Sequence, residues 1–392
     1  MIMSLLPGMQ TIAEEITKIR HYLHQHPELG FEEIETSNLV AEKLTAWGYK
    51  VTRGFGKTGM VAQLSTGDGP TIGLRADMDA LPITEENNFS HKSQNPGKMH
   101  ACGHDGHTST LLAAAQYLAE NPHFQGTVNL YIQPAEEGLG GAKAMIDDGA
   151  LQQFPCDAMF GFHNMPGFPA GHFGFKAGSA MASSDRVTVT ITGKGGHGAM
   201  PQFSIDPIVI ASSIVMSLQT IVSRNVDPLK MTVISVGSIH AGQTFNVIPE
   251  TATMQLSIRN LDPATQDQVE TRVKEIINGQ AASFGASAAI DYVRSYPILY
   301  NHATETEFAQ NVARQVLGDE KIIDDFPAMT ASEDFAFFAN EVSACYLFVG
   351  NGDIGTYSCS VHNPKYDFND ALIPIVANYW VNLVYAFCPK QS

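Results

Sequence analysis

The sequence has few basic residues and no long uninterrupted apolar run, and each shortage excludes a class of partner. Lysine and arginine total 23 against 40 acidic residues, which gives a formal net charge of −17. A chain this acidic offers no broad electropositive surface, so we expect no nucleic acid partner. Its apolar runs are interrupted before they reach the roughly 20 residues that span a bilayer, so we expect no membrane partner.

Cysteine is also scarce: the chain has only Cys102, Cys156, Cys345, Cys359 and Cys388. An odd number without paired spacing is not the pattern of a disulfide-stabilised secreted domain. The first residues lack the basic and apolar segments of a signal peptide. We therefore expect reduced thiols and a cytoplasmic protein.

The order of predicted elements divides the 392 residues into two domains, as expected at this length. Apolar strand-like runs at 60–64, 71–76, 126–133 and 157–162 alternate with helical patterns, the first at 11–26 and another at about 108–120. The same alternation resumes after Pro297. This pattern predicts an α/β domain, a mixed sheet flanked by helices, built from the two segments 1–184 and 295–392.

The stretch between these segments, 185–294, has a different pattern. Its predicted order is strand, helix, strand, strand, helix, strand, with the helices at 206–223 and 263–283. A β-α-β-β-α-β order is that of a ferredoxin-like unit. The sequence therefore predicts a complete inserted domain that makes the first domain discontinuous.

The first predicted helix carries three histidines, His21, His24 and His26. Histidines near a helix end are more often solvated than functional. We interpret these three in that way.

Side chains of the types that bind metals gather where strands of the first domain should end. In chain order they are Asp77, Asp79, Cys102, His104, Glu136, Glu137 and His163. Because the carboxyl ends of parallel strands meet at one edge of a sheet, we expect these groups to converge. Thiol, imidazole and carboxylate together suit Zn²⁺, Mn²⁺, Co²⁺ or Ni²⁺. Each residue alone could be a cap, a turn or a core residue, but their convergence favours a metal site.

Two of these carboxylates, Glu136 and Glu137, are adjacent. One can bind metal while the other takes a proton from water and returns it to a leaving amine. The spacing does not say which residue does which, but the pair favours catalysis over simple binding.

Five motifs in this order also suggest a family: RADMDALPI (75–83), MHACGHDGH (99–107), QPAEEG (133–138), GKGGHGAMP (193–201) and NVIP (246–249). Together they resemble the M20 metallopeptidase family, in particular its amidohydrolase branch of aminoacylases, hippurate hydrolases and indole-acetyl-amino-acid hydrolases. The resemblance implies a zinc-exopeptidase-like fold for the larger domain. It also implies that the inserted domain is a lid and dimerisation domain, so we expect a homodimer, or a dimer of dimers, formed through this domain.

The resemblance further implies a centre of two divalent transition-metal ions, Mn, Zn, Co or Ni. Its ligands would be Cys102, His104, Glu137, His163 and His362. Glu136 would be the general base and acid, and Asp79 would orient a ligand, while Asp77 stands where other branches have a histidine ligand. By its residues alone, His362 would be interpreted as a loop histidine.

In the inserted domain the resemblance implies substrate contacts by His197, Asn246 and Arg259. His197 would approach a substrate carbonyl or oxyanion, and Arg259 is suited to a bidentate contact with a substrate carboxylate. In a homodimer, His197 or Asn246 of one subunit can complete the site of the other.

The implied activity is metal-dependent hydrolysis of the amide bond of an N-acyl amino acid. In it, Glu136 deprotonates the water that bridges the ions and later protonates the leaving amine. A dipeptide exopeptidase of the same fold is one alternative, and a non-catalytic metal-binding protein is the other.

Overall fold

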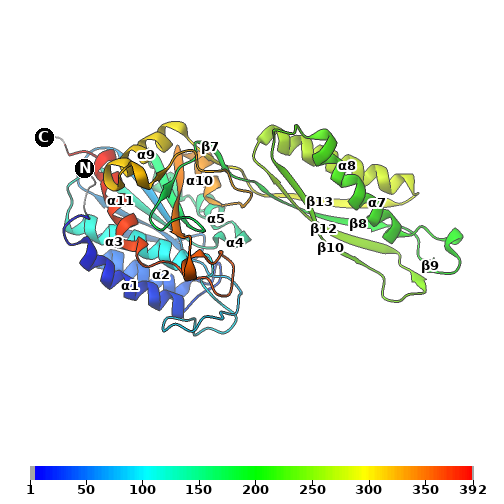
Figure 1. Ribbon diagram of the computed structural model, residues 1–392, viewed down its shortest axis with the longest axis horizontal. Coiled ribbons are helices and arrows are strands. Elements are labelled where there is room, and N and C mark those ends of the chain that lie inside the picture. Colours follow the sequence, from blue (N-terminus) through cyan, green and yellow to red (C-terminus); the bar gives the residue numbers. More distant parts are fainter. Residues whose placement is uncertain (1–4, 391–392) are drawn as a thin grey trace. The chain divides into compact units, whose positions relative to one another are not determined.

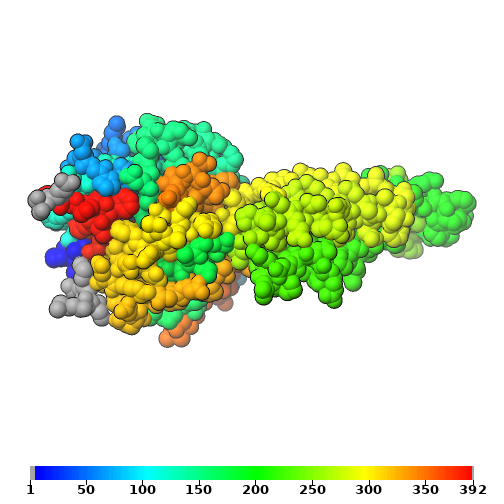
Figure 2. Space-filling view, turned by 90° about the horizontal axis from the view of Figure 1, so that it is seen from above, coloured from blue at the N-terminus to red at the C-terminus, as the bar shows by residue number. Residues whose placement is uncertain are grey.

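The computed structural model describes residues 5–390, which form two compact units. Unit 1 comprises the residues up to Gly178 together with Tyr300–Pro327 and the residues from Asp334 onward. Unit 2 comprises Ser179–Leu299 and Ala328–Glu333. The colours show that unit 1 combines blue and cyan residues with orange and red ones, although the second unit separates them along the chain (Figure 1; Figure 2).

The limits of the units differ from the boundaries predicted at 184/185 and 294/295. Unit 2 is wider at both ends and also takes in the later segment Ala328–Glu333. This segment pairs with the chain inside unit 2, because the amide of Ala182 donates to the carbonyl oxygen of Ala331 at 2.9 Å. Pairing between segments so far apart has no local signal in the sequence.

Unit 1 contains most of the helices and the larger sheet. Its helices are α1 (Met9–Gln25), α2 (Ile34–Ala46), α3 (His104–Glu120), α4 (Glu136–Leu139), α5 (Gly141–Asp147), α6 (Ala150–Gln153), α9 (Ala303–Leu317), α10 (Phe335–Glu341) and α11 (Leu372–Phe387). Its strands are β1 (Lys50–Phe55), β2 (Gly59–Ser65), β3 (Thr71–Asp77), β4 (Thr127–Gln133), β5 (Ala158–Pro166), β6 (Phe173–Gly174), β15 (Ile322–Ile323) and β16 (Ala344–Gly352). Strands β7 (Gly178–Met181) and β14 (Leu299–Asn301) lie where the chain passes between the units.

The strands of unit 1 form one mixed sheet in the order β1-β2-β4-β3-β5-β16-β6-β15. Its central strands β4, β3, β5 and β16 run parallel, whereas β1, β2 and β6 are antiparallel to their neighbours nearer the centre. Parallel strands that are covered on both faces have nearly continuous apolar sequences. Strand β3 follows this pattern, since it is buried from Ile72 to its end. The carboxyl ends of β3, β4 and β5 therefore lie at one edge of the sheet.

Helices flank this sheet, which confirms the predicted fold class (Figure 1). Helix α3 packs on β3 and β5 and against α1 and α11, while α5 and α10 contact each other and further strands. The core contains large side chains such as Leu112, Phe160 and Trp380, each at most 1% exposed. Burial of one such side chain contributes about 1.5–3 kcal/mol. The packed helices thereby hold the edge of the sheet in place.

Unit 2 has the order predicted for the inserted domain. Its main elements are β8 (Ser184–Thr192), α7 (Pro207–Thr220), β10 (Thr232–Ala241), β12 (Thr251–Asn260), α8 (Pro263–Ser283) and β13 (Ser287–Tyr296). The strands pair antiparallel in the order β10-β12-β8-β13, which is the ferredoxin-like arrangement. Asp206 and Asp262 cap α7 and α8, since each carboxylate accepts a hydrogen bond from a first-turn amide and a proline follows. A small ladder pairs β9 (Gly196–His197) with β11 (Val247–Ile248).

One helix of unit 2 is unusually apolar. Helix α7 and the π-helical turn after it, Pro207–Asn225, are long and apolar enough to cross a membrane by length and composition. Ile210, Ile214 and Leu218 on this helix are buried in the core of unit 2. Core helices pass the same test, so the length and composition of α7 say little about a membrane.

Candidate metal centre

The loop before α3 requires glycine at one position. Gly103 has a φ of +96°, and a Cβ there would lie 2.4 Å from both Asn164 Oδ1 and Tyr366 Oη. No other residue fits this conformation and this space. The turn starts α3 at His104, earlier than the predicted start near 108, and leaves Cys102 and His104 on either side of it.

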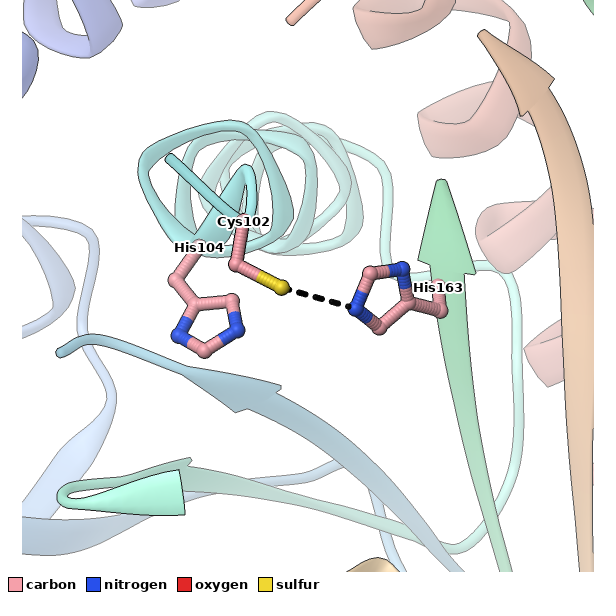
Figure 3. A group of neighbouring side chains, drawn as sticks. All are labelled: Cys102, His104 and His163. Atoms are coloured by element: carbon pink, nitrogen blue, oxygen red, sulfur yellow. Dashed lines mark hydrogen bonds between the residues drawn. The ribbon is translucent and has the colours of Figure 1, made fainter. Parts of the chain in front are cut away.

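The thiol of Cys102 faces the ring of His163, which projects from β5 (Figure 3). The distance from Cys102 Sγ to His163 Nε2 is 3.3 Å. His163 Nδ1 lies 2.7 Å from the carbonyl oxygen of Asn164, which can only accept, so Nδ1 carries the proton and Nε2 presents a lone pair. Burial lowers the pKa of His163 to about 3, so the ring is neutral, the form that binds metals.

His104 is oriented by a carboxylate. Its Nδ1 lies 3.1 Å from Asp79 Oδ1, and Asp79 Oδ2 accepts the amide of Glu137 at 2.9 Å. A histidine ligand commonly donates one ring nitrogen to a carboxylate and turns the other to the metal. Burial disfavours charge on His104, but the carboxylates of Asp77 and Asp79 outweigh it and raise its pKa to about 10. A bound cation would have to displace that proton.

Strand β4 leads into a turn that presents the two adjacent glutamates. Ala135 adopts a left-handed conformation with a φ of +53°, and its amide donates to Glu33 Oε1 at 2.8 Å. Glu136 is only 7% exposed. One carboxylate oxygen from each of Glu136 and Glu137 and one nitrogen of His104 lie within 4.8 Å of one another. The turn therefore brings a proton acceptor next to candidate ligands.

His362, on the loop before α11, reaches the same cluster. Its φ is +65°, and its amide donates to the carbonyl oxygen of Ala101 at 2.7 Å, which ties this loop to the one before α3. His362 Nε2 lies 3.1 Å from Glu137 Oε1. The ligand atoms of Cys102, Glu137 and His362 are within 4.8 Å of one another, as are those of Cys102, His104 and His163. These two groups of three share Cys102.

The electrostatics of the cluster favour bound cations. Burial raises the pKa of Cys102 well above its usual value, and the negative charges of Glu137 and Glu136 add to the effect, so a thiolate here needs positive charge beside it. His104 Nε2 is buried and has no hydrogen-bond partner within residues 5–390. Thiolate, imidazole and carboxylate are donors that divalent transition metals take. The residues present therefore fit such a centre.

His107 and Asp77 lie beside the cluster but already have partners. His107 Nδ1 is 2.7 Å from Asp77 Oδ1, and its Nε2 is 2.7 Å from Asn164 Oδ1. Asp77 Oδ2 accepts from Arg75 at 2.7 Å. These contacts give Asp77 a structural task, and its carboxylate also forms, with His104 and His107, a further group that could hold a metal ion.

Two residues behind the cluster have structural tasks that the sequence alone did not indicate. The buried Arg75 donates to Asp77 and, at 3.1 Å, to Asp334 Oδ1, while the amide of Asp334 donates to Glu136 Oε1 at 3.4 Å. The sequence does contain one signal for the role of Arg75: it is a charged residue within the apolar run of β3, and a buried charge must be paired. The signal at Asp334 was weaker, since nothing local indicates its distant partners.

Glu33 is a third such residue, and its burial leads to a testable prediction. Its carboxylate accepts from Thr58 Oγ1 at 2.6 Å as well as from Ala135, and burial raises the pKa of Glu33 to about 7. Because this value exceeds the usual 4.5, ionisation of Glu33 costs the folded state stability as the pH rises from about 4.5 through 7. The cost is roughly 3 kcal/mol.

Glu33→Gln should remove this cost. We expect the unfolding free energy of the metal-free variant, relative to that of the unaltered protein, to be about 3 kcal/mol larger at pH 8 than at pH 4.5, as measured by urea unfolding. Glu35→Gln, which changes an exposed carboxylate on α2, is the matched control and should show no such difference. A Glu33→Gln effect that is the same at both pH values would contradict the prediction.

The residues expected to contact substrate lie in unit 2. His197 and Asn246 are exposed and come together at the β9–β11 ladder, where the amide of Gly198 donates to the carbonyl oxygen of Asn246 at 2.8 Å. Arg259, near the end of β12, donates to Ser332 Oγ at 2.7 Å. Their roles toward substrate, and the pairing of two copies through this unit, stay predictions.

Comparison with known proteins gives consistent matches along the chain. A family model described as "Peptidase family M20/M25/M40" matches residues 73–386. The hippurate hydrolase of Campylobacter jejuni is 44% identical over 97% of this chain and 98% of its own length. IAA-amino acid hydrolase ILR1-like 2 of Arabidopsis thaliana is 43% identical over 96% of this chain and 86% of its own.

A solved structure agrees with these matches. It is that of a Bacillus subtilis protein described as a dinuclear metal binding peptidase from the M20 family. The two structures superpose with a TM-score of 0.84 at 30% identity, over 97% of this chain and 100% of that one.

Proposed function

The chain belongs to peptidase family M20/M25/M40, and on that premise we propose that it is a metal-dependent amidohydrolase that cleaves the amide bond of N-acyl amino acids. The observation that carries the proposal is the pair of three-ligand groups that share Cys102, with Glu136 beside them. A protein that only stored or sensed metal would need no second carboxylate next to its ligands.

We assign the ligands of two divalent ions to Cys102, His104, Glu137, His163 and His362. Mn²⁺, Zn²⁺, Co²⁺ and Ni²⁺ all accept this donor set. When bound, such ions polarise a substrate carbonyl and make water acidic enough to be deprotonated near neutral pH. Asp79 keeps His104 in the tautomer that presents Nε2, since a carboxylate accepts the proton on Nδ1.

Glu136 moves the proton in the proposed reaction. Its carboxylate takes a proton from the attacking water and gives it to the nitrogen of the leaving amine. The bond from the amide of Asp334 to Glu136 Oε1 holds one oxygen of this carboxylate in place. The short turn after β4 keeps it beside the ligand Glu137.

The relatives indicate the substrate class. A hippurate hydrolase and an IAA-amino acid hydrolase act, by their names, on amino acids whose amine carries an acyl group. The substrate of such a reaction carries the carboxylate of its amino acid, and both products carry a carboxylate as well. We propose that Arg259 binds the substrate carboxylate and that His197 and Asn246 contact the substrate near the scissile carbonyl.

A substrate panel tests this function. The purified protein would be assayed with N-acetyl, N-benzoyl, indole-acetyl and longer N-acyl amino acids and with dipeptides that release the same amino acid, in the presence of each of the four metals. We expect kcat/KM for the best N-acyl amino acid to exceed that of the matched dipeptide by at least about 100-fold, because an acyl pocket has no partner for a buried ammonium. A preference for dipeptides would identify an exopeptidase, and no turnover of either class would leave only binding.

A further inference from the structure

Helix α1 places two cations in the interior of unit 1. Arg20 and His24 are both fully buried, although the sequence pattern predicted a solvated helix end. That prediction is wrong for His24, because α3 and the loop before α11 pack over this face of α1 and supply carboxylates to it. Neither residue takes part in the reaction proposed above.

His24 lies between two carboxylates. Its Nδ1 is 2.8 Å from Asp105 Oδ2, and its Nε2 is 3.2 Å from Glu85 Oε1. Since an ionised carboxylate can only accept, both ring nitrogens donate, and the ring is an imidazolium. Burial opposes this charge, but the charge of Asp105 overcomes it and raises the pKa of His24 to about 9.

Arg20 joins the carboxylate of Asp105 to the loop before α11. Its guanidinium is 3.2 Å from Asp105 Oδ2 and 3.0 Å from Asp367 Oδ1, and its Nε is 2.7 Å from Asp370 Oδ1. Asp105 and Asp367 are themselves buried. One nitrogen, Nη1, contacts both Asp105 and Asp367, while Nε contacts Asp370, so the guanidinium holds three carboxylates at once, which the single ammonium of lysine does less well.

Two of these carboxylates, those of Asp105 and Asp367, lie on the segments that carry candidate ligands. Asp105 directly follows His104 in the first turn of α3, and Asp367 lies on the loop that carries His362. These segments lie far apart in the sequence and contact directly through the hydrogen bond from the amide of His362 to the carbonyl oxygen of Ala101. Arg20 is a second, charged connection between them.

We propose that Arg20 and His24 are positioning residues for metal binding: by holding Asp105 and Asp367, they fix the spacing between the ligands His104 and His362. The inference rests on the proposed metal centre. Without the two cations, the buried carboxylates would repel each other, and the loops that carry the ligands would separate. Metal affinity would then fall even though all five ligands are present.

The test measures Co²⁺ binding to metal-free protein by calorimetry and by the absorption band of cobalt bound to the thiolate of Cys102. In His24→Gln the side-chain amide keeps one hydrogen-bond donor group, but the second donor and the positive charge of the imidazolium are lost. We expect Co²⁺ to bind it about 10- to 100-fold more weakly, the usual effect of changing residues that orient ligands. His26→Gln, the same substitution two residues along, is the matched control and should bind like the unaltered protein.

Arg20→Lys and Asp367→Asn are the second set of variants, in case His24→Gln does not fold. Each preserves size closely, and each should weaken Co²⁺ binding in the same direction. Thermal unfolding of the metal-free variants separates the two possible roles. Lower thermal stability with an unchanged Co²⁺ dissociation constant and absorption band would show a purely structural network and overturn the inference. Failure of the unaltered protein to bind Co²⁺ would instead refute the proposed metal centre, and the inference with it.

Discussion

Replacing Glu136 with glutamine is expected to lower kcat by about 10³-fold while the protein keeps its metal content. The amide has nearly the shape of the carboxylate, but it cannot take a proton from water or return one to the leaving amine, and loss of such a group typically costs 10²–10⁴-fold. Because the amide oxygen can still accept the bond from Asp334, the turn should stay folded. KM should change little, since we assign Glu136 no ground-state contact with the substrate.

The measurements are steady-state kinetics on the best substrate of the panel and elemental analysis of the purified variant. Glu35→Gln, an exposed substitution of the same kind, should leave both unchanged. A variant at Glu136 with near-normal kcat would refute its role as general base. A variant that loses metal would show that Glu136 is a ligand and would leave Glu137 as the candidate base.

Removal of divalent cations is expected to abolish activity, and adding back Mn²⁺, Zn²⁺, Co²⁺ or Ni²⁺ is expected to restore it. Neither the carbonyl nor the attacking water would be activated without them, so the residual rate should fall below about 10⁻³ of the loaded rate. The loaded protein should also unfold at a higher temperature, because a ligand at 100 times its dissociation constant stabilises the native state by about 2.7 kcal/mol.

Cysteine variants give this experiment a control. Cys102→Ser removes the one donor that both candidate ligand groups share, and we expect it to prevent restoration at metal concentrations that restore the unaltered protein. Cys156→Ser changes a half-buried cysteine that belongs to neither group and should respond to metal as the unaltered protein does. Activity that survives complete chelation would contradict the proposed function.

Much of the centre could be predicted because its information is local. Carboxylates placed directly after apolar runs need only the rule that parallel strands end at one edge to bring them together. Asp79, Glu136 and Glu137 follow β3 and β4 and converge for this reason, whereas Cys102 and His104 reach the same edge from the start of α3, and His163 lies within β5. His362 has no such signal, since it lies on a loop that follows no ligand-bearing strand, and it was predicted only through the resemblance to a family.

The sequence by itself determined the alternation of strands and helices, the ferredoxin-like inserted domain and the edge of the sheet where ligands gather. Only the tertiary structure decided what surrounds them: that His24 is a buried imidazolium, that Glu33 supports the turn at Ala135, and that Arg75 joins Asp77 to Asp334. The physical reason is the range of the interactions. Apolar periodicity and glycine turns act between near neighbours in the chain, whereas burial and ion pairing depend on which distant segments pack against a residue.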